Sequence, residues 1–390
     1  MASNDLTFNQ IATVLTDIVK QATGQEVITP VDAKEFVSVG QTALKVGYDP
    51  LLNAISQVLS RTIFSVRPYS RKFQGLEVSN QRFGNWTRKL NISDGDWVDT
   101  PRFELTDGQS IDQYKVNKPN ILQTNFYGSN VFDLEPITIF KDQLDCAFES
   151  AEEFARFISM IMSNASDRIE QAHENVARAT IGNLIGAKVQ YDTDNVIHLL
   201  TEYNTLTGLS LTAQTVYQPD NFVGFIQWVW SRLENISDMM TERSLKYHIN
   251  VTNKPIMRHT PRERQRVYMY APARHQITSR VLADTYHDNL MRFAYTETVN
   301  FWQNIDTPTD VKVKPVYLKN DGTIIEGDTE TVNNVFAVIT DAETMGYTVV
   351  NQWSGTSPFN AAGGYTNYFW HFTDRYLTDF TENAVVLLLD

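Results

Sequence analysis

One stretch of the sequence, residues 149–187, carries an uninterrupted helical pattern of apolar side chains. Apolar residues recur at steps of three and four from Phe154 to Leu184. The stretch has no proline, and its glycines, Gly182 and Gly186, stand near its end. At about 1.5 Å per residue it predicts a helix of about 55 Å, far longer than the globular mean of about 11–12 residues. Such a rod is typical of coiled coils and of proteins that use one helix as a spine.

The rest of the chain shows both helical and strand patterns, without repeats or low-complexity tracts. Helices are expected where apolar residues recur at helical spacing or where proline follows a capping residue, and strands where short apolar runs occur. The expected elements are helices at 8–19, from Asp49, at 221–243 and from Pro272, a hairpin within 311–325, and strands at 266–271, 335–339 and 384–389. We therefore expect an α+β fold.

Residues 62–127 change to β-strand and turn character, and their charges are segregated. Between Arg61 and Asn91 the sequence has seven basic residues and one acid, whereas residues 92–112 carry a net charge of −5. Few large aliphatic residues are present, so this segment is poorly suited to forming its own core. Basic residues among aromatics are typical of nucleic-acid binding. The net charge of −13, however, argues against a protein whose main task is gripping phosphate.

Motifs for catalysis, cofactors or metals are weak or incomplete. Glu170 and His173 have the spacing of a di-iron ligand pair, but no second copy exists, so a solvent-exposed helix face is favoured. Residues 355–359 begin like a nucleophile elbow but lack its closing glycine. The arginine-rich run 258–280 could bind phosphate or an acidic protein surface, but surface arginine without a particular partner is expected. We expect no catalytic, cofactor-binding or metal site.

The bulk sequence also limits where the protein works. The single cysteine, Cys146, excludes an intrachain disulfide and fits a reducing compartment. No run of 18 apolar residues is present, so no membrane span is expected. The N-terminus has acid where a signal peptide needs Lys or Arg, so secretion is not expected.

Two segments carry a resemblance to a known family. Residues 49–73, DPLLNAISQVLSRTIFSVRPYSRKF, and residues 82–91, RFGNWTRKLN, resemble the N-terminal part of major capsid proteins from tailed bacteriophages. The aromatic run 367–372, NYFWHF, is similar to capsids of small short-tailed phages. The resemblance implies the capsid fold that tailed phages share with encapsulins and herpesviruses.

This resemblance also implies a division of the chain into named parts. They are an N-terminal arm at 1–61, an extended E-loop at 62–128, a peripheral domain at 129–210 with its spine helix at 149–187, an axial domain at 211–365, and a return to the peripheral sheet at 366–390. Within the last part, the strand at 384–389 is expected to rejoin the peripheral sheet.

The function implied is structural. The chain would assemble with itself into hexamers and pentamers of an icosahedral phage head, in the host cytoplasm and without a cofactor. Portal and scaffolding proteins would be its partners, and the shell would enclose double-stranded DNA without sequence-specific binding. The open alternatives are an encapsulin-like compartment, a soluble enzyme and a nucleic-acid-binding protein that uses the basic tract.

Opposite charges on neighbouring copies are expected to set the register of assembly. The basic side is predicted to consist of Arg67, Arg71, Lys72, Arg82, Arg88 and Lys89. The acidic side on the neighbour is predicted to include Asp94, Asp96 and Asp99 of the same segment, or Glu149, Glu152 and Glu153 at the start of the long helix. In a few relatives a lysine of the E-loop forms a covalent cross-link to a neighbour. Lys72 or Lys89 could be nominated for that role here, but cross-linking is not expected.

Overall fold

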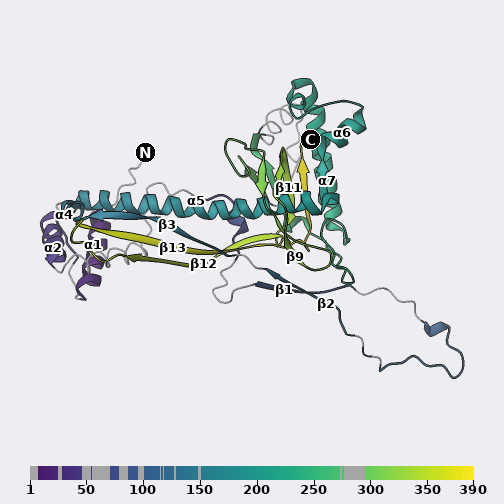
Figure 1. Ribbon diagram of the computed structural model, residues 1–390, viewed down its shortest axis with the longest axis horizontal. Coiled ribbons are helices and arrows are strands. Elements are labelled where there is room, and N and C mark those ends of the chain that lie inside the picture. The colour runs from purple at the N-terminus through teal and green to yellow at the C-terminus, as the bar shows by residue number, and fades with distance from the viewer. Residues whose placement is uncertain are drawn as a thin grey trace.

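The computed structural model describes residues 8–24, 29–45, 54, 71–78, 87–94, 101–114, 116, 118–126, 129–147, 151–272, 275 and 295–390. These residues form an elongated molecule (Figure 1). A long helix and a long sheet lie side by side, a body of sheets and helices lies at one end, and a two-stranded ribbon projects past that body. The mixture of helices and sheets confirms the α+β fold.

The long helix is α5, Ala151–Tyr191, with 41 residues. It confirms the helix predicted at 149–187. Its C-terminal half buries one face against the main core, including Ile181, Leu184 and Ile185. Gly186 lies inside the helix because a strand crosses closely there: a Cβ atom at this position would stand 2.3 Å from Cγ1 of Val313.

Two helices at the N-terminus pack on the start of α5. They are α1, Phe8–Thr23, which confirms the predicted helix, and α2, Ala33–Lys45. The ring of Phe36 lies 6.3 Å from that of Phe8 and 5.8 Å from that of Phe154 on α5. The helix predicted from Asp49 lies outside the described residues except for Ala54, which is helical and buried.

A three-stranded antiparallel sheet runs alongside α5 (Figure 1). Its strand order is β12, Met345–Thr356, then β13, Tyr365–Thr378, then β3, Ser129–Phe140, and a short helix α4, Lys141–Ala147, links β3 to α5. Buried and partly exposed residues alternate along β13, because one face of the sheet packs on α5 and the other does not.

The body is built on a five-stranded sheet. Its strand order is β4, Val196–His198, then β14, Ala384–Leu388, β11, Val335–Asp341, β5, Gln265–Tyr270, and β6, Tyr295–Val299. One face shares a core with α5. The other face packs on α6, Leu199–Thr207, and α7, Pro219–Thr241. The helix predicted at 221–243 and the strands predicted at 266–271, 335–339 and 384–389 are confirmed.

The strand at 384–389 lies in the five-stranded sheet of the body and not in the sheet along the long helix. β14 pairs with β11 and β4 in the five-stranded sheet, and it is β13 that lies beside β3 along the long helix. The physical reason lies in the side-chain pattern. Every residue of β14 is apolar and buried, which suits a sheet covered on both faces.

Two short strand pairs complete the body. β8, Val316–Leu318, pairs with β9, Ile324–Glu326, and confirms the predicted hairpin, whose turn places Gly322 at a φ of 87°. β7, Val311–Val313, pairs with β10, Glu330–Val332. Short 3-10 helices occupy Gln74–Leu76, Pro101–Phe103, Thr193–Asn195, Thr215–Tyr217 and Arg262–Arg264. Most of the helix predicted from Pro272 lies outside the described residues.

Candidate self-assembly surface

The ribbon, residues 87–126, has one face toward its own subunit and one face toward solvent. Its strands are β1, Thr87–Ile92, and β2, Ile121–Phe126, in an antiparallel pair. Directly opposed residues lie on the same face of such a pair. Leu122 and Thr124 are buried, whereas Leu90, Ile92 and Ile121 on the other face are exposed. The outer face therefore exposes apolar side chains that no other part of the described residues covers.

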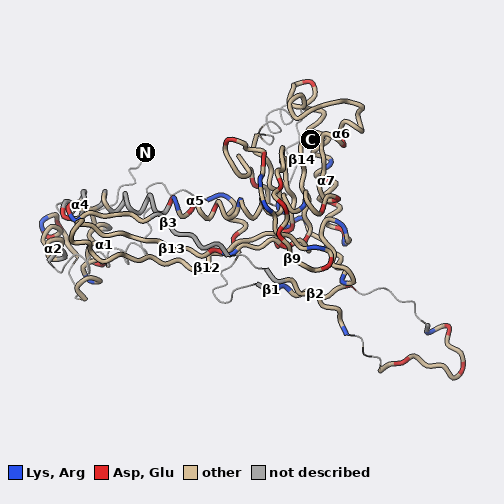
Figure 2. The backbone as a smooth tube through the Cα atoms, in the orientation of Figure 1, with Lys and Arg blue, Asp and Glu red and all other residues tan. Residues whose placement is uncertain are grey.

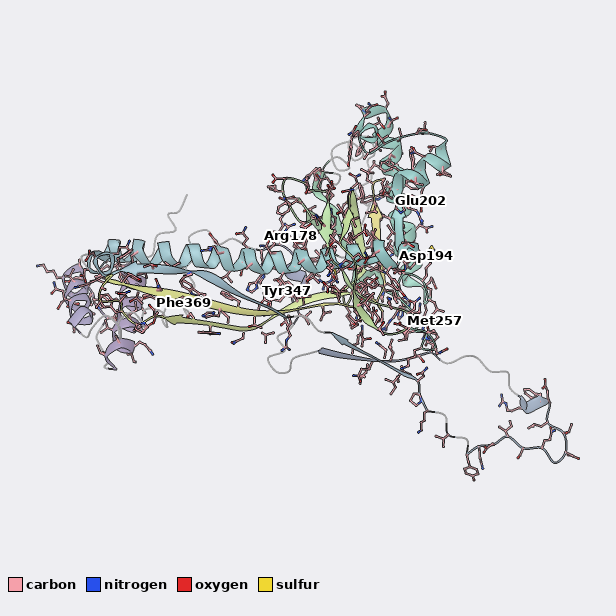
Figure 3. The ribbon with its side chains drawn as sticks, in the orientation of Figure 1. Arg178, Asp194, Glu202, Met257, Tyr347 and Phe369 are labelled. Atoms are coloured by element: carbon pink, nitrogen blue, oxygen red, sulfur yellow. The ribbon has the colours of Figure 1, made fainter. Side chains whose placement is uncertain are left out.

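The tip of the ribbon, residues 101–116, has no core of its own. Every one of its residues whose burial is described is exposed, including Phe103 at 89%, Tyr114 at 84% and Val116 at 78%. Figure 3 shows the side chains of this segment pointing outward from an extended loop. Contiguous exposed apolar side chains in a soluble protein mark interaction sites, so the tip is a candidate contact surface.

A second uncovered apolar surface lies on the three-stranded sheet, on the face that does not pack on α5. We call the side chains of Phe140, Trp353, Tyr365, Phe369 and His371 the aromatic strip. Trp353 is 54% exposed and stacks on His371 with ring centroids 3.9 Å apart. Phe140 is 47% exposed and meets Tyr365 edge-on at 5.9 Å. Figures 1 and 3 place the strip, marked by Phe369, well away from the ribbon tip.

Lys89 holds the inner face of the ribbon to the body. Its Nζ lies 2.9 Å from Oδ2 of Asp379 and 3.3 Å from Oε2 of Glu343, and it also donates to Glu382. Burial lowers the pKa of Lys89, but the charges of Asp379 and Glu382 and the hydrogen bonds to them outweigh this effect and raise it. The lysine is therefore a charged internal anchor.

The segment before the ribbon, residues 71–78, is also tied down within the subunit. Phe73 is buried, with its backbone in the left-handed region at a φ of 64°. Its N–H donates to Glu297 at 2.6 Å, and the N–H of Lys72 donates to Glu174 of α5 at 3.2 Å. The guanidinium of Arg178 lies over the Phe73 ring at 5.1 Å. The chain thus enters the ribbon from a rigid starting point.

A family model of Phi29-like phage major capsid proteins matches residues 15–388. The chain belongs to this family. In the capsid of Staphylococcus phage Andhra, a chain of 11% identity superposes with a TM-score of 0.57, and the match covers 84% of this capsid protein and 87% of that chain. A chain in the structure of the head fibre and inner core protein of native bacteriophage P68 gives a TM-score of 0.53 at 11% identity, with the same coverages. No curated protein matches the sequence.

Membership of this family, and not the fold alone, establishes the role of the protein. The capsid protein is a structural component of a tailed-phage virion and associates with copies of itself in a shell. In the part of the chain that the structure describes, no helix is long and apolar enough to cross a membrane. Among the same residues, no cluster of three or more His, Cys, Asp or Glu is arranged to hold a metal ion.

The charged residues predicted to contact a neighbour fall into three groups. Arg71, Lys89 and Asp94 have partners inside the capsid protein: Arg71 pairs with Glu77 and Glu170, and Asp94 pairs with Arg243. Lys72 lies at the base of the ribbon, Arg88 on β1, and Glu152 and Glu153 in the first turn of α5. Those outside the described residues are Arg67, Arg82, Asp96, Asp99 and Glu149.

Two expectations about polar residues are wrong. His173 is not on a solvated helix face: it is buried, and its Nδ1 lies 2.8 Å from Oδ2 of Asp374 on β13. The arginines of the 258–266 run are paired rather than free, for example Arg264 with Asp341 at 3.0 Å. In both cases the partner lies far away in the sequence, so no local pattern reports it.

The aromatic strip was not among the contact residues predicted from the sequence. A signal was present, because Tyr365, Asn367, Phe369 and His371 alternate with a second set of large residues on β13. Alternation with aromatics on both sides predicts a strand whose two faces both bury apolar surface. One face meets α5, and on the other face Trp353 and Phe140 stay exposed among the residues that the structure describes.

Proposed function

We propose that this capsid protein forms the hexamers and pentamers of an icosahedral head around double-stranded DNA by inserting its ribbon into a neighbouring copy. The main support for this proposal is the exposure of Phe103, Tyr114 and Val116 at the tip of the ribbon. The aromatic strip is the proposed acceptor. Tip and strip are different surfaces that lie far apart. Each copy therefore places its tip on the strip of one neighbour and receives the tip of another neighbour on its own strip. Such heterologous contacts close into rings.

Charge is proposed to set the register of this contact. Arg71 and Lys89 have acidic partners inside the subunit, so the basic residues left for a neighbour are Arg67, Lys72, Arg82 and Arg88. Their proposed partners on the next copy are Asp96 and Asp99, or Glu149, Glu152 and Glu153. The tip carries both acids and bases (Figure 2), which favours one orientation over others.

The remaining parts of the proposal rest on family membership. Residues 1–61, 62–128, 129–210, 211–365 and 366–390 are proposed as arm, E-loop, peripheral domain, axial domain and returning segment. Portal and scaffolding proteins are the proposed assembly partners, with assembly in the host cytoplasm. The role is structural, and no catalytic step is proposed.

The test replaces the apolar side chains of the tip by serine in the full-length chain, as Phe103→Ser, Tyr114→Ser and Val116→Ser together. Each buried large apolar side chain contributes about 1.5–3 kcal/mol, so closed shells should be lost from electron micrographs. The unfolding free energy of the subunit should change by no more than about 0.5 kcal/mol, because these side chains are exposed.

The matched control removes exposed polar side chains from the same tip, as Ser110→Ala and Gln113→Ala, and should assemble normally. Closed shells of normal yield from the triple serine variant would contradict the proposal that the tip makes the contact.

A further inference from the structure

The base of the ribbon meets the body at two separate polar clusters, and the first surrounds Lys89. Asp379 and Glu382 belong to the turn between β13 and β14, and Glu343 precedes β12. Asp379 and Glu382 are almost fully buried. Lys89 therefore joins β1 to the turns at which the chain passes between the three-stranded and the five-stranded sheet.

The first cluster depends on Lys89 for its charge balance. Besides Lys89 it holds two cations: Arg264, 2.8 Å from Glu343 and 3.0 Å from Asp341, and Arg258, 3.1 Å from Glu382. The four carboxylates of Asp341, Glu343, Asp379 and Glu382 thus face three cations. Without Lys89 only two cations would face four carboxylates, and buried charge without a partner is unfavourable.

The second cluster lies at the other end of β1 and ties the ribbon to the loop between α7 and β5. The carboxylate of Asp94 accepts from Arg243 and from the N–H of Met257. On the opposite strand, Asn120 Nδ2 donates to the carbonyl of Asn253 at 2.6 Å, and Lys254 donates to the carbonyl of Ile121 at 2.9 Å. Figure 3 shows Met257 where the ribbon leaves the body.

These clusters hold the ribbon at two points. Lys89 and Asp94 are five residues apart, which is about 17 Å along an extended strand. One attachment would let the ribbon pivot, whereas two attachments at this spacing fix its direction. The inner-face residues Leu122 and Thr124, buried between the clusters, add contact but no comparable charge.

We propose that Lys89 and Asp94 are positioning residues for assembly, which fix the angle between the ribbon and the body and so decide where the tip meets the next copy. This inference rests on the proposed ribbon contact. It assigns Lys89 to its own subunit rather than to a neighbour. A change in the angle would alter the curvature between adjacent copies, and with it the size of the shell.

The experiment compares three single variants of the full-length chain. Lys89→Met empties the first cluster of its central cation, and Asp94→Asn weakens the second cluster without leaving buried acids unpaired. Lys118→Met is the matched control, because it removes an equal charge from an exposed position on the same ribbon. Amide hydrogen exchange of the subunit and particle diameters by electron microscopy are measured for each.

Amides of residues 87–94 and 118–126 should exchange on the order of ten-fold faster in Lys89→Met and Asp94→Asn than in the control, while amides of β11 and β14 stay protected. Particles of both variants should show a broader range of diameters. If Lys89→Met does not fold, Asp94→Asn still decides the question.

Exchange and diameters equal to those of Lys118→Met would overturn the inference. Faster exchange with unchanged diameters would show that the clusters do not control geometry, and would also overturn it. Loss of all particles upon the triple serine substitution of the tip tests the ribbon contact separately, so the two failures are distinguishable.

Discussion

Individual charged residues of the ribbon segment serve two different purposes. Lys89 and Arg71 neutralise acids of their own subunit, and both are only partly accessible. Lys72 differs, because its backbone N–H is bound to Glu174 while its side chain has no bond described within the subunit. Basic residues that look alike in the sequence are therefore separated by the fold into internal anchors and residues available to a partner.

Reversing available charges should impair assembly more than reversing others. The variant Lys72→Glu with Arg88→Glu should give on the order of ten-fold fewer closed shells, because like charges would then face each other across the contact. Negative-stain imaging measures the yield. The control variant Lys34→Glu with Lys312→Glu changes the net charge by the same amount at exposed positions on other elements, and its assembly should be impaired less.

A second-site reversal sharpens this test. Adding Glu152→Lys and Glu153→Lys to the Lys72 and Arg88 variant should restore shells if those acids are the acceptors. Normal shells from the first variant would show that these charges do not set the register.

At the scale of elements, the strand β7 that crosses α5 determines where this helix needs glycine. The helix follows from its own side-chain pattern, but whether its two internal glycines are needed depends on how closely β7 approaches each of them. A Cβ at Gly182 would stand 3.4 Å from Val311, an ordinary contact, whereas at Gly186 it would clash with Val313. Glycine is therefore required at one of the two positions only.

This difference predicts opposite effects of the same substitution. Gly182→Ala should be neutral or stabilise the subunit by up to about 1 kcal/mol, since alanine favours the helix. Gly186→Ala should destabilise it by about 1–2 kcal/mol, because overpacking outweighs the helix preference. Chemical denaturation of both variants measures the difference. Equal free energies of unfolding would contradict the close approach of β7.

Elements with local patterns could be predicted from the sequence, and long-range pairings could not. The spacing of apolar residues along 149–187 is a property of that stretch alone, so α5 could be predicted from it. Local patterns of the same kind predicted α7 and the hairpin at Gly322. The partners of Lys89 stand 254 to 293 residues away in the chain, and β3 pairs with a strand more than 200 residues later. The apolar run of β14 predicts a strand, but its neighbours β11 and β4 are set by long-range pairing.

The whole molecule is a body, a rod and a projecting ribbon rather than a single globule (Figure 1). Among the described residues, the tip and the aromatic strip expose apolar side chains in a chain with a net charge of −13. Like charge keeps free subunits apart at a distance, and short-range apolar contact holds them once they meet in the correct orientation. The subunit is thus completed by its neighbours.

Completion by neighbours predicts a change in protease sensitivity. Chymotrypsin should cut free subunits quickly after Phe103 and Tyr114, which are exposed in an extended loop, and should cut assembled shells at least ten-fold more slowly there. Mass spectrometry of the fragments locates the cuts, and an added unfolded substrate controls for enzyme activity. Equal cutting of the tip in shells and in free subunits would mean that assembly leaves the tip uncovered.

The central place of β14 has a consequence for how the protein is made. Residues 384–388 lie between β4 and β11, so a nascent or truncated chain without them presents two unpaired strand edges and an open core. The five-stranded sheet therefore cannot close until residues 384–388 are free to pair with both neighbouring strands. A chain cut before residue 384 should therefore lack a closed body, and we expect it to be excluded from the growing particle.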